Sequence, residues 1–189
     1  AAPALARAGV SMEEVAAVGL DTPGPASAKG VLSAKGSTNF VHEDWSSFDI
    51  RGALESKLGK PVVYLNDANA AALWGHFALF GTNSGKTSIS IIVGTGNGGG
   101  VIVNDRVMEG KNGFGGELGH VLVPYSEIPE IAGLEPICNC GRIGDLESLC
   151  SLTSIRMNVL PYLLKQHPEH ELAKLDIAKA AYAARGLAA

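Results

Sequence analysis

The chain has 189 residues, of which 46% are hydrophobic and 18% charged, so it can bury a core and has the composition of an ordinary soluble globular protein. A formal net charge of −4 without a basic run argues against a nucleic-acid-binding surface, and no apolar stretch is long enough to cross a membrane. Three cysteines, two of them in the pair Cys138-x-Cys140, make no disulfide framework. Their spacing favours a metal or reduced thiols in the cytoplasm.

The first part of the chain is predicted to alternate between helices and strands. Residues 11–14 read Ser-Met-Glu-Glu, which has the form of a capping box, so we expect a short helix there and a strand over residues 15–20. The turn Thr22-Pro23-Gly24-Pro25 follows at the carboxyl end of that strand, where α/β sheets place their ligands. Asp49 is predicted to cap a helix that runs to about Leu58 and ends at Gly59.

Asn66 and Asp67 follow a short β-rich segment, residues 61–65, and precede an apolar helix predicted over residues 70–80. Asp67 therefore lies between the end of a strand and the N-terminus of a helix, and two roles are open for it. As an N-cap it would accept backbone N–H bonds and stabilise the helix by about 1 kcal/mol. As a general base it would take a proton from a substrate hydroxyl.

A glycine-rich turn, residues 94–100, separates two apolar runs, which predicts a β-hairpin. Its five glycines exceed what chain reversal requires. Glycine permits φ > 0 and close approach of a ligand, and successive N–H groups in such a turn form a nest for an anion. The turn is either a phosphate loop containing Gly94, Thr95 and Gly96 or a tight hairpin without a ligand. A Walker lysine pattern and a directly following helix are both absent from the sequence, so neither a P-loop nor a dinucleotide fingerprint fits.

Most of the remaining polar motifs lie after residue 110. Glu117 and His120 occur in the sequence Glu-Leu-Gly-His, a strand is expected over residues 121–123, and Cys138 and Cys140 follow. A helical tail is predicted from about residue 146, with breaks near residues 161 and 168 and an Ala-rich helix around residues 177–185.

Five segments, in this order, resemble the ROK family (repressor, open reading frame, kinase) of bacterial sugar kinases and regulators: residues 22–25, 66–71, 94–100, 117–120 and 138–147. The resemblance spans about residues 19–148 and implies the α/β, actin/hexokinase-like ATPase (ribonuclease H-like) fold with two lobes. Residues 1–84 would belong to the N-terminal lobe and residues 85–189 would begin the C-terminal lobe. The family's opening Asp-x-Gly-Gly-Thr hairpin is absent from this sequence, and so are the adenosine-binding glycines expected towards the family's carboxyl end. We therefore expect a chain that is incomplete at both ends.

The resemblance implies ATP-dependent phosphorylation of a glucose-like hexose. Asp67 would deprotonate the sugar hydroxyl for attack on the γ-phosphate of Mg²⁺-ATP, and the residues Gly94, Thr95 and Gly96 would hold the ATP phosphates. Polar side chains would bind the sugar hydroxyls, namely Asn39, Asn66, Glu117, His120 and Glu147. The family also implies a homodimer. The cysteine usage favours the cytoplasm, and the charge and hydropathy of this segment predict neither a nucleic-acid nor a membrane partner.

A structural zinc is the last implication of the resemblance. The family pattern supplies one histidine and three cysteines, but here Asp145 occupies the position of the third cysteine. Zinc accepts the donors that remain, which are one nitrogen, two sulfurs and one oxygen. They belong to His120, Cys138, Cys140 and Asp145. The alternative is an empty or weak site whose loop is held by hydrogen bonds. Cys150 is expected to be a buried helix residue, and Asn97 stands where the family usually has an aliphatic residue.

Two other functions remain open at the level of the sequence. A sugar-responsive transcriptional regulator would share the sugar pocket and add a DNA-binding domain, which a helix-turn-helix segment before residue 1 would reveal. A sugar-binding remnant without turnover is the third alternative. Asp67 favours the kinase, because a pure sensor needs no base.

Overall fold

The computed structural model describes residues 2–24, 26–27, 29–33 and 42–176. The chain divides into two compact units, one made of Ala1–Ile89 with Gly100–Gly116 and the other of Ser90–Gly99 with Glu117–Ala189. Asn39 and the helix expected at residues 177–185 lie outside the described residues. The lobe boundary expected at residue 84 stays a prediction about the lobes of the family fold.

The first unit begins with helix α1 (Ala2–Ala8), which the sequence analysis did not predict. The helix expected at residues 11–14 is wrong, although its capping contact forms: Ser11 N–H donates to Glu14 Oε2 at 2.8 Å. The chain makes one turn there and becomes extended, because Val18 N–H already donates to Pro61 O at 2.9 Å. Pairing with a neighbouring strand therefore overrides the local helix signal, and the strand runs from Val18 to Thr22 instead of over residues 15–20.

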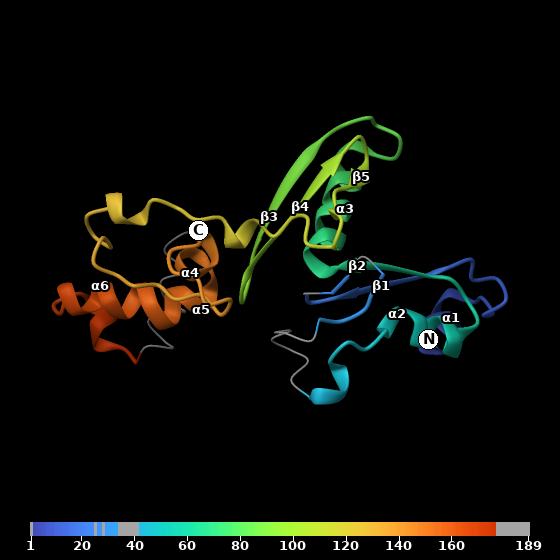
Figure 1. Ribbon diagram of the computed structural model, residues 1–189, viewed down its shortest axis with the longest axis horizontal. Coiled ribbons are helices and arrows are strands. Elements are labelled where there is room, and N and C mark those ends of the chain that lie inside the picture. The colour runs from blue at the N-terminus through green and yellow to red at the C-terminus, as the bar shows by residue number, and fades with distance from the viewer. Residues whose placement is uncertain (1, 25, 28, 34–41, 177–189) are drawn as a thin grey trace. The chain divides into compact units, whose positions relative to one another are not determined.

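Two parallel strands, β1 (Val18–Thr22) and β2 (Val62–Asn66), form the sheet of this unit (Figure 1). Their register pairs Thr22 with Asn66, so the carboxyl ends of both strands lie at the same edge. A short 3₁₀ turn, η1 (Glu43–Trp45), and helix α2 (Ile50–Leu58) lie between them in sequence. The predicted ends of α2 are confirmed: Asp49 accepts the Gly52 N–H, and Gly59 ends the helix with φ of 64°. A buried hydrophobic cluster of this unit contains Ala26, Leu32 and Tyr64.

Helix α3 (Asp67–Phe80) follows β2 without a loop and ends at Gly81, which confirms the predicted helix. Its buried residues are Asn69, Ala72 and His76. A Cβ on Gly100 would overlap the Ala72 Cβ and lie 3.1 Å from Asn69 Oδ1. Glycine at position 100 therefore lets the helix and the following sheet approach closely.

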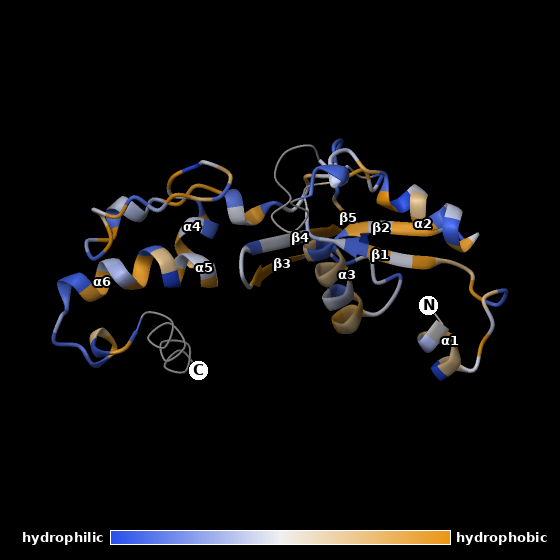
Figure 2. Cartoon of the chain, turned by 90° about the horizontal axis from the view of Figure 1, so that it is seen from below, coloured by the Kyte–Doolittle hydropathy of each residue, from blue (hydrophilic) through white to orange (hydrophobic). Residues whose placement is uncertain are grey.

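A second sheet has the order β3 (Ser88–Val93), β4 (Asn97–Val103) and β5 (Arg106–Val107). Figure 2 shows the hydrophobic character of β3. The predicted hairpin is confirmed, but its turn is only three residues long, Gly94 to Gly96, because the glycines at positions 98–100 belong to β4. The sequence turns again at Asn104 and Asp105, both with positive φ, as the two-residue hairpin turn of type I′ requires.

The second unit is mostly loop and short helix. It contains the 3₁₀ turns η2 (Leu118–His120) and η3 (Tyr125–Glu127). The strand expected at residues 121–123 is wrong: within the described chain Leu122 makes only an isolated bridge with Asp145. Three apolar residues in a row are too short a pattern to define a strand when no neighbouring strand pairs with them.

The helical tail begins at residue 146 as predicted, with α4 (Leu146–Cys150), α5 (Leu152–Ser154), the π-helical turn η4 (Ile155–Val159), α6 (Leu160–Gln166) and the 3₁₀ turn η5 (Glu171–Lys174). The break lies at Ser151, whose side chain caps α5, and the expected break near residue 161 is wrong. Pro161 stands in the first turn of α6, directly after the π-helical turn η4, so the chain stays helical through this position. Cys150 is exposed, so its predicted burial is also wrong.

Candidate functional site

Asn66 and Asp67 are positioned by the direct junction of β2 and α3. Asn66 Oδ1 accepts the N–H groups of Ala68 at 3.0 Å and Asn69 at 3.3 Å, so Asn66 is the N-cap of the helix. Asp67 is the first helical residue and is exposed, and its Oδ1 accepts the Ala68 N–H at 2.8 Å. The N-cap interpretation of Asp67 is therefore wrong. Its carboxylate lies at the carboxyl edge of the parallel strands, where it can accept a proton from a ligand hydroxyl.

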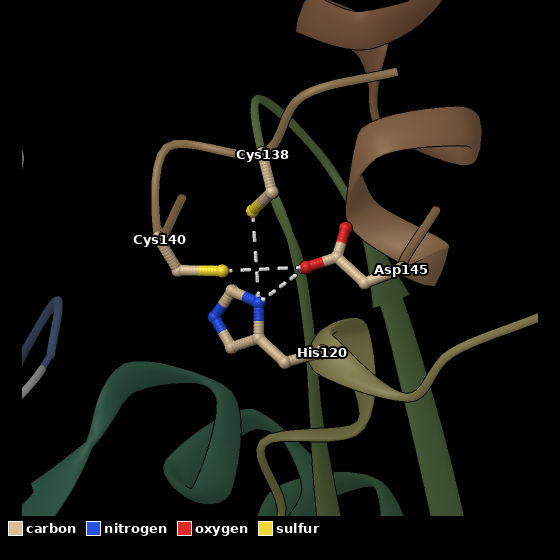
Figure 3. Close-up of side chains that lie close together, drawn as sticks. All are labelled: His120, Cys138, Cys140 and Asp145. Atoms are coloured by element: carbon tan, nitrogen blue, oxygen red, sulfur yellow. Dashed lines mark hydrogen bonds and ion pairs between the residues drawn. The ribbon is translucent and has the colours of Figure 1, made fainter. Parts of the chain in front are cut away.

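His120, Cys138, Cys140 and Asp145 form a compact cluster, which we call the candidate metal group. One ligand atom from each residue lies within 4.8 Å of all the others, and Figure 3 shows the four side chains converging. Asp145 Oδ2 lies 3.0 Å from His120 Nδ1 and 3.5 Å from Cys140 Sγ, and Cys138 Sγ lies 3.7 Å from His120 Nδ1. The side chains come from η2, a loop and the N-terminus of α4.

The donor set of this group fits zinc. Tetrahedral zinc with nitrogen, oxygen and sulfur ligands separates its donor atoms by about 3.3–3.8 Å. Three of the separations found here are 3.0, 3.5 and 3.7 Å, and all four donor atoms lie within 4.8 Å of one another. Asp145 is fully buried, and its other oxygen, Oδ1, accepts the Ser148 N–H at 2.8 Å, which fixes the direction of Oδ2. A cysteine at position 145 could not make that cap, so the substitution of the family cysteine changes the helix start as well as the donor set.

Burial and hydrogen bonding shift the pKa values of two members in opposite directions. Burial raises the pKa of the Cys138 thiol. Burial also acts to raise the pKa of Asp145, but hydrogen bonds from His120 and the Ser148 N–H outweigh it and hold that pKa below its usual value. Burial thus disfavours the charged form of the thiol, whereas hydrogen bonds favour the charged form of the carboxylate.

His120 offers its two ring nitrogens to different neighbours. Nδ1 faces the candidate metal group, whereas Nε2 lies 3.9 Å from Glu117 Oε2. The residue was predicted both as a sugar ligand and as a metal ligand, and this geometry leaves room for both roles.

The glycine turn (Gly94, Thr95 and Gly96) lies in the same unit as Glu147. Glu147 Oε2 accepts the Asn97 N–H at 2.9 Å, and Glu147 Oε1 accepts the Cys138 S–H at 3.4 Å. A single carboxylate thus touches both the end of the glycine turn and the candidate metal group. Neither Gly94 nor Gly96 has a positive φ. At Gly96 glycine allows the close approach of Glu147, whereas a Cβ on Gly94 would meet no atom closer than 3.9 Å.

The predicted site residues therefore fall into two sets. Asn66 and Asp67 adjoin one another in the first unit, whereas the second unit brings together the glycine turn, Glu117, His120, Cys138, Cys140, Asp145 and Glu147. Asn39 lies outside the described residues.

Sequence reasoning missed two residues that position this chemistry. Asn69 is buried, and its Nδ2 donates to Gly115 O at 3.2 Å, which ties α3 to the loop before Glu117. Asn97 Nδ2 donates to Leu146 O at 3.2 Å and so joins β4 to α4. The sequence does show that Asn97 is polar where the family usually has an aliphatic residue. It does not show that the side chain bonds to a residue 49 positions away.

A hollow of about 520 Å³ also lies along α3, lined by Leu73, Trp74, Phe77 and the His76–Asp105 pair. It is mainly apolar, and none of the predicted site residues lines it. Size alone would make it a candidate site, but the polar groups that such a site needs are gathered elsewhere.

Comparison with known proteins agrees with the motif pattern. The model of the ROK family matches residues 3–189, which is nearly the whole chain. The chain belongs to the ROK family. A glucokinase from Halalkalibacterium halodurans is 37% identical over 140 residues, 72% of this chain and 40% of the relative. A xylose repressor from Caldicellulosiruptor bescii is 34% identical over 127 residues, 66% of this chain and 29% of the relative.

Solved ROK structures have the same fold. The chain superimposes on a ROK hexokinase from Thermus thermophilus with a TM-score of 0.62 and 38% identity, covering 82% of this chain and 46% of that one. A ROK glucokinase from Streptomyces griseus, in complex with glucose and AMPPNP, matches with a TM-score of 0.54 and 31% identity over 82% of this chain and 46% of that one. These matches confirm the predicted actin/hexokinase-like ATPase fold. The chain spans about two fifths of the length of the curated relatives it matches. Among the described residues, no helix has both the length and the apolar character of a membrane span.

Proposed function

We propose that the protein carrying this chain is an ATP-dependent kinase of a glucose-like hexose. Asp67 accepts the proton of one sugar hydroxyl while that oxygen attacks the γ-phosphorus of ATP. The bond between the γ-phosphorus and its bridging oxygen breaks, ADP leaves, and Mg²⁺ offsets the charge of the phosphates. ROK relatives named glucokinase and a ROK glucokinase solved with glucose and AMPPNP support the choice of hexose and ATP.

The environment of Asp67 is the observation that carries this proposal. Asn66 is the N-cap of α3, so the cap does not require a carboxylate at the next position, although Asp67 also accepts the Ala68 N–H at 2.8 Å. Asp67 is exposed at the carboxyl edge of two parallel strands, beside Asn66, whose amide can hydrogen-bond a sugar hydroxyl. A base that must meet a substrate needs this exposure, whereas a cap does not.

The remaining roles fall mainly to residues of the second unit. The glycine turn would receive the ATP phosphates, since two of its three residues carry no side chain to obstruct them. Glu117, His120 and Glu147, together with Asn39 and Asn66, would bind the sugar hydroxyls. The family resemblance also supports a homodimer in the cytoplasm.

We also propose that the candidate metal group holds a structural zinc. His120 Nδ1, Cys138 Sγ, Cys140 Sγ and Asp145 Oδ2 are the four donors, and their separations suit a tetrahedral ion. When bound, the zinc supplies cross-linking of the loop to α4 and no part of the phosphoryl transfer.

A sugar-responsive repressor is the second candidate function, supported by the 34% identity to a xylose repressor. Both candidates share the sugar pocket, and they differ in whether the bound sugar is phosphorylated.

The test is ATP-dependent phosphorylation of a panel of hexoses by the full chain, with sugar binding measured in parallel by calorimetry. We expect phosphorylation of glucose or a close relative and its loss in Asp67→Asn. Asp44→Asn, which removes an exposed carboxylate of η1, is the matched control and should keep full activity. Sugar binding without phosphorylation by this chain alone would show that it keeps the sugar pocket but lacks a working ATP site. The same result for the longer protein that carries the chain would reject the kinase.

A further inference from the structure

The carboxylate of Glu147 occupies a position that a sugar ligand alone does not explain. Its Oε2 accepts the Asn97 N–H at 2.9 Å, immediately after the glycine turn, and its Oε1 accepts the Cys138 S–H at 3.4 Å, inside the candidate metal group. The first contact joins residues 50 apart in the sequence and the second joins residues 9 apart. Glu147 therefore joins two parts of the proposed site that have separate roles.

The glycine turn is held on two sides within its unit. On one side the N–H groups of Leu152 and Thr153, at the start of α5, donate to Gly94 O at 2.9 Å and Thr95 O at 3.4 Å. On the other side stands the Glu147 carboxylate. A Cβ on Gly96 would lie 2.5 Å from Glu147 Oε2, so glycine at this position is what allows the carboxylate to reach the turn.

Glu147 is in turn fixed by the candidate metal group. It lies in the first turn of α4, two residues after Asp145, whose Oδ1 caps the helix through the Ser148 N–H at 2.8 Å. Asp145 Oδ2 faces His120 and Cys140. An ion bound at Oδ2 would hold the capping carboxylate in place, and with it the start of the helix that carries Glu147.

We propose that Glu147 is a positioning residue for the glycine turn and that it transmits occupancy of the candidate metal group to that turn. A metal bound by Asp145 steadies the first turn of α4, Glu147 then holds the Asn97 amide, and the turn keeps one conformation. That this steadies a phosphate-binding conformation rests on the proposed kinase function. The coupling itself concerns only contacts of this chain.

The test is amide hydrogen exchange at residues 94–97 of the full chain, with and without stoichiometric zinc. We expect zinc to slow exchange there by about tenfold in the unmodified protein, the size expected for securing one hydrogen bond of this kind. Glu147→Ala should abolish this effect. Glu147→Gln should keep the zinc-dependent slowing of exchange, because the glutamine amide oxygen can still accept the Asn97 N–H. Glu127→Gln, at an exposed position of the same unit, is the matched control.

The variants separate positioning from sugar binding. Glu147→Gln should weaken hexose binding, because it removes the charge that strengthens hydrogen bonds from hydroxyls, while leaving the protection of the turn intact. Gly96→Ala keeps Glu147 but should displace it from the turn and so reproduce the loss of zinc-dependent protection, which guards against misfolding of Glu147→Ala. Equal zinc protection in Glu147→Ala and the unmodified protein would overturn the proposal, as would a chain that takes up no zinc. Phosphorylation is not the readout, so a failed kinase assay would leave this result unaffected.

Discussion

Asp105 shows how a single carboxylate can hold several segments of the first unit. It stands in the β4–β5 turn with φ of 64°, and it accepts hydrogen bonds from the Gly85 N–H at 2.6 Å, from the Ser84 hydroxyl and from His76 Nε2 at 2.8 Å. Hydrogen bonds from Ser84, His76 and the Gly85 N–H lower the pKa of Asp105 to about 2. The turn, α3 and the segment before β3 are therefore linked through one charge.

The depressed pKa predicts how stability depends on pH. Asp105 has a lower pKa in the folded protein than the value of about 3.9 in the unfolded chain, so its contribution is complete above about pH 4. That contribution is lost as the pH falls through the folded value of about 2. Asp105→Asn should therefore be less stable than the unmodified protein at pH 7, with a gap that narrows between pH 4 and pH 2.

Urea denaturation at several pH values, followed by circular dichroism, measures this gap. Asp44→Asn is the control, since Asp44 is exposed and pairs only with His42 two residues away among the contacts described. A gap that stays constant from pH 7 to pH 2 would contradict the role assigned to the Asp105 charge.

Two glycines on facing elements illustrate what glycine does at the scale of helices and strands. Gly100 in β4 has no room for a Cβ because Ala72 and Asn69 of α3 lie against it. Gly75 lies on α3 itself, and a Cβ there would meet nothing within 4 Å. The first glycine permits packing between elements, and the second only weakens a helix.

The same substitution should therefore have opposite effects at these two positions. Gly100→Ala should destabilise the protein by about 1–3 kcal/mol, because the added methyl group separates β4 from α3. Gly75→Ala should stabilise it by about 0.5–1 kcal/mol, because alanine favours the helix. Thermal denaturation of the two variants tests the sign, and a stabilising Gly100→Ala would show that the sheet and helix do not pack as described.

Elements with strong local signals could be predicted from the sequence. Helix α2 has a capping Asp49 and a terminating Gly59, and both act as expected. Two failures occurred where distant pairing decides the outcome. Residues 11–14 form one turn before the strand that begins at Val18, and residues 121–123 find no neighbouring strand in the described chain. Similarly, nothing local shows that the glycines at positions 98–100 belong to β4, because their role depends on side chains of other elements.

At the scale of the whole molecule, the family motifs predicted which distant residues come together, which the local helix and strand patterns could not do. Residues as far apart as His120 and Asp145 were predicted to form one group, and the structure brings them within hydrogen-bonding distance. Their role as zinc ligands stays a prediction. The connection between Asn97 and Glu147 could not have been predicted, because it depends on an amide and a carboxylate 50 residues apart.

Loss of one donor from the candidate metal group should affect the loop as a whole. Cys138→Ser should lower zinc affinity by at least about 100-fold and increase proteolytic cleavage between residues 124 and 145, since the loop loses its cross-link. Cys150→Ser, at an exposed position outside the group, is the control. Metal analysis of purified protein provides the measurement, and unchanged zinc content in Cys138→Ser would rule out the zinc assignment.

The proposed role of Asp67 as the base of a sugar kinase is tested most directly by the effect of Asp67→Asn on kcat and on hexose affinity, measured separately. A base acts in the transition state, so kcat for hexose phosphorylation should fall by about 10²–10⁴-fold while the hexose dissociation constant changes little. An Asp67→Asn variant that retains most of its kcat, or that loses hexose binding and kcat in equal measure, would contradict the account.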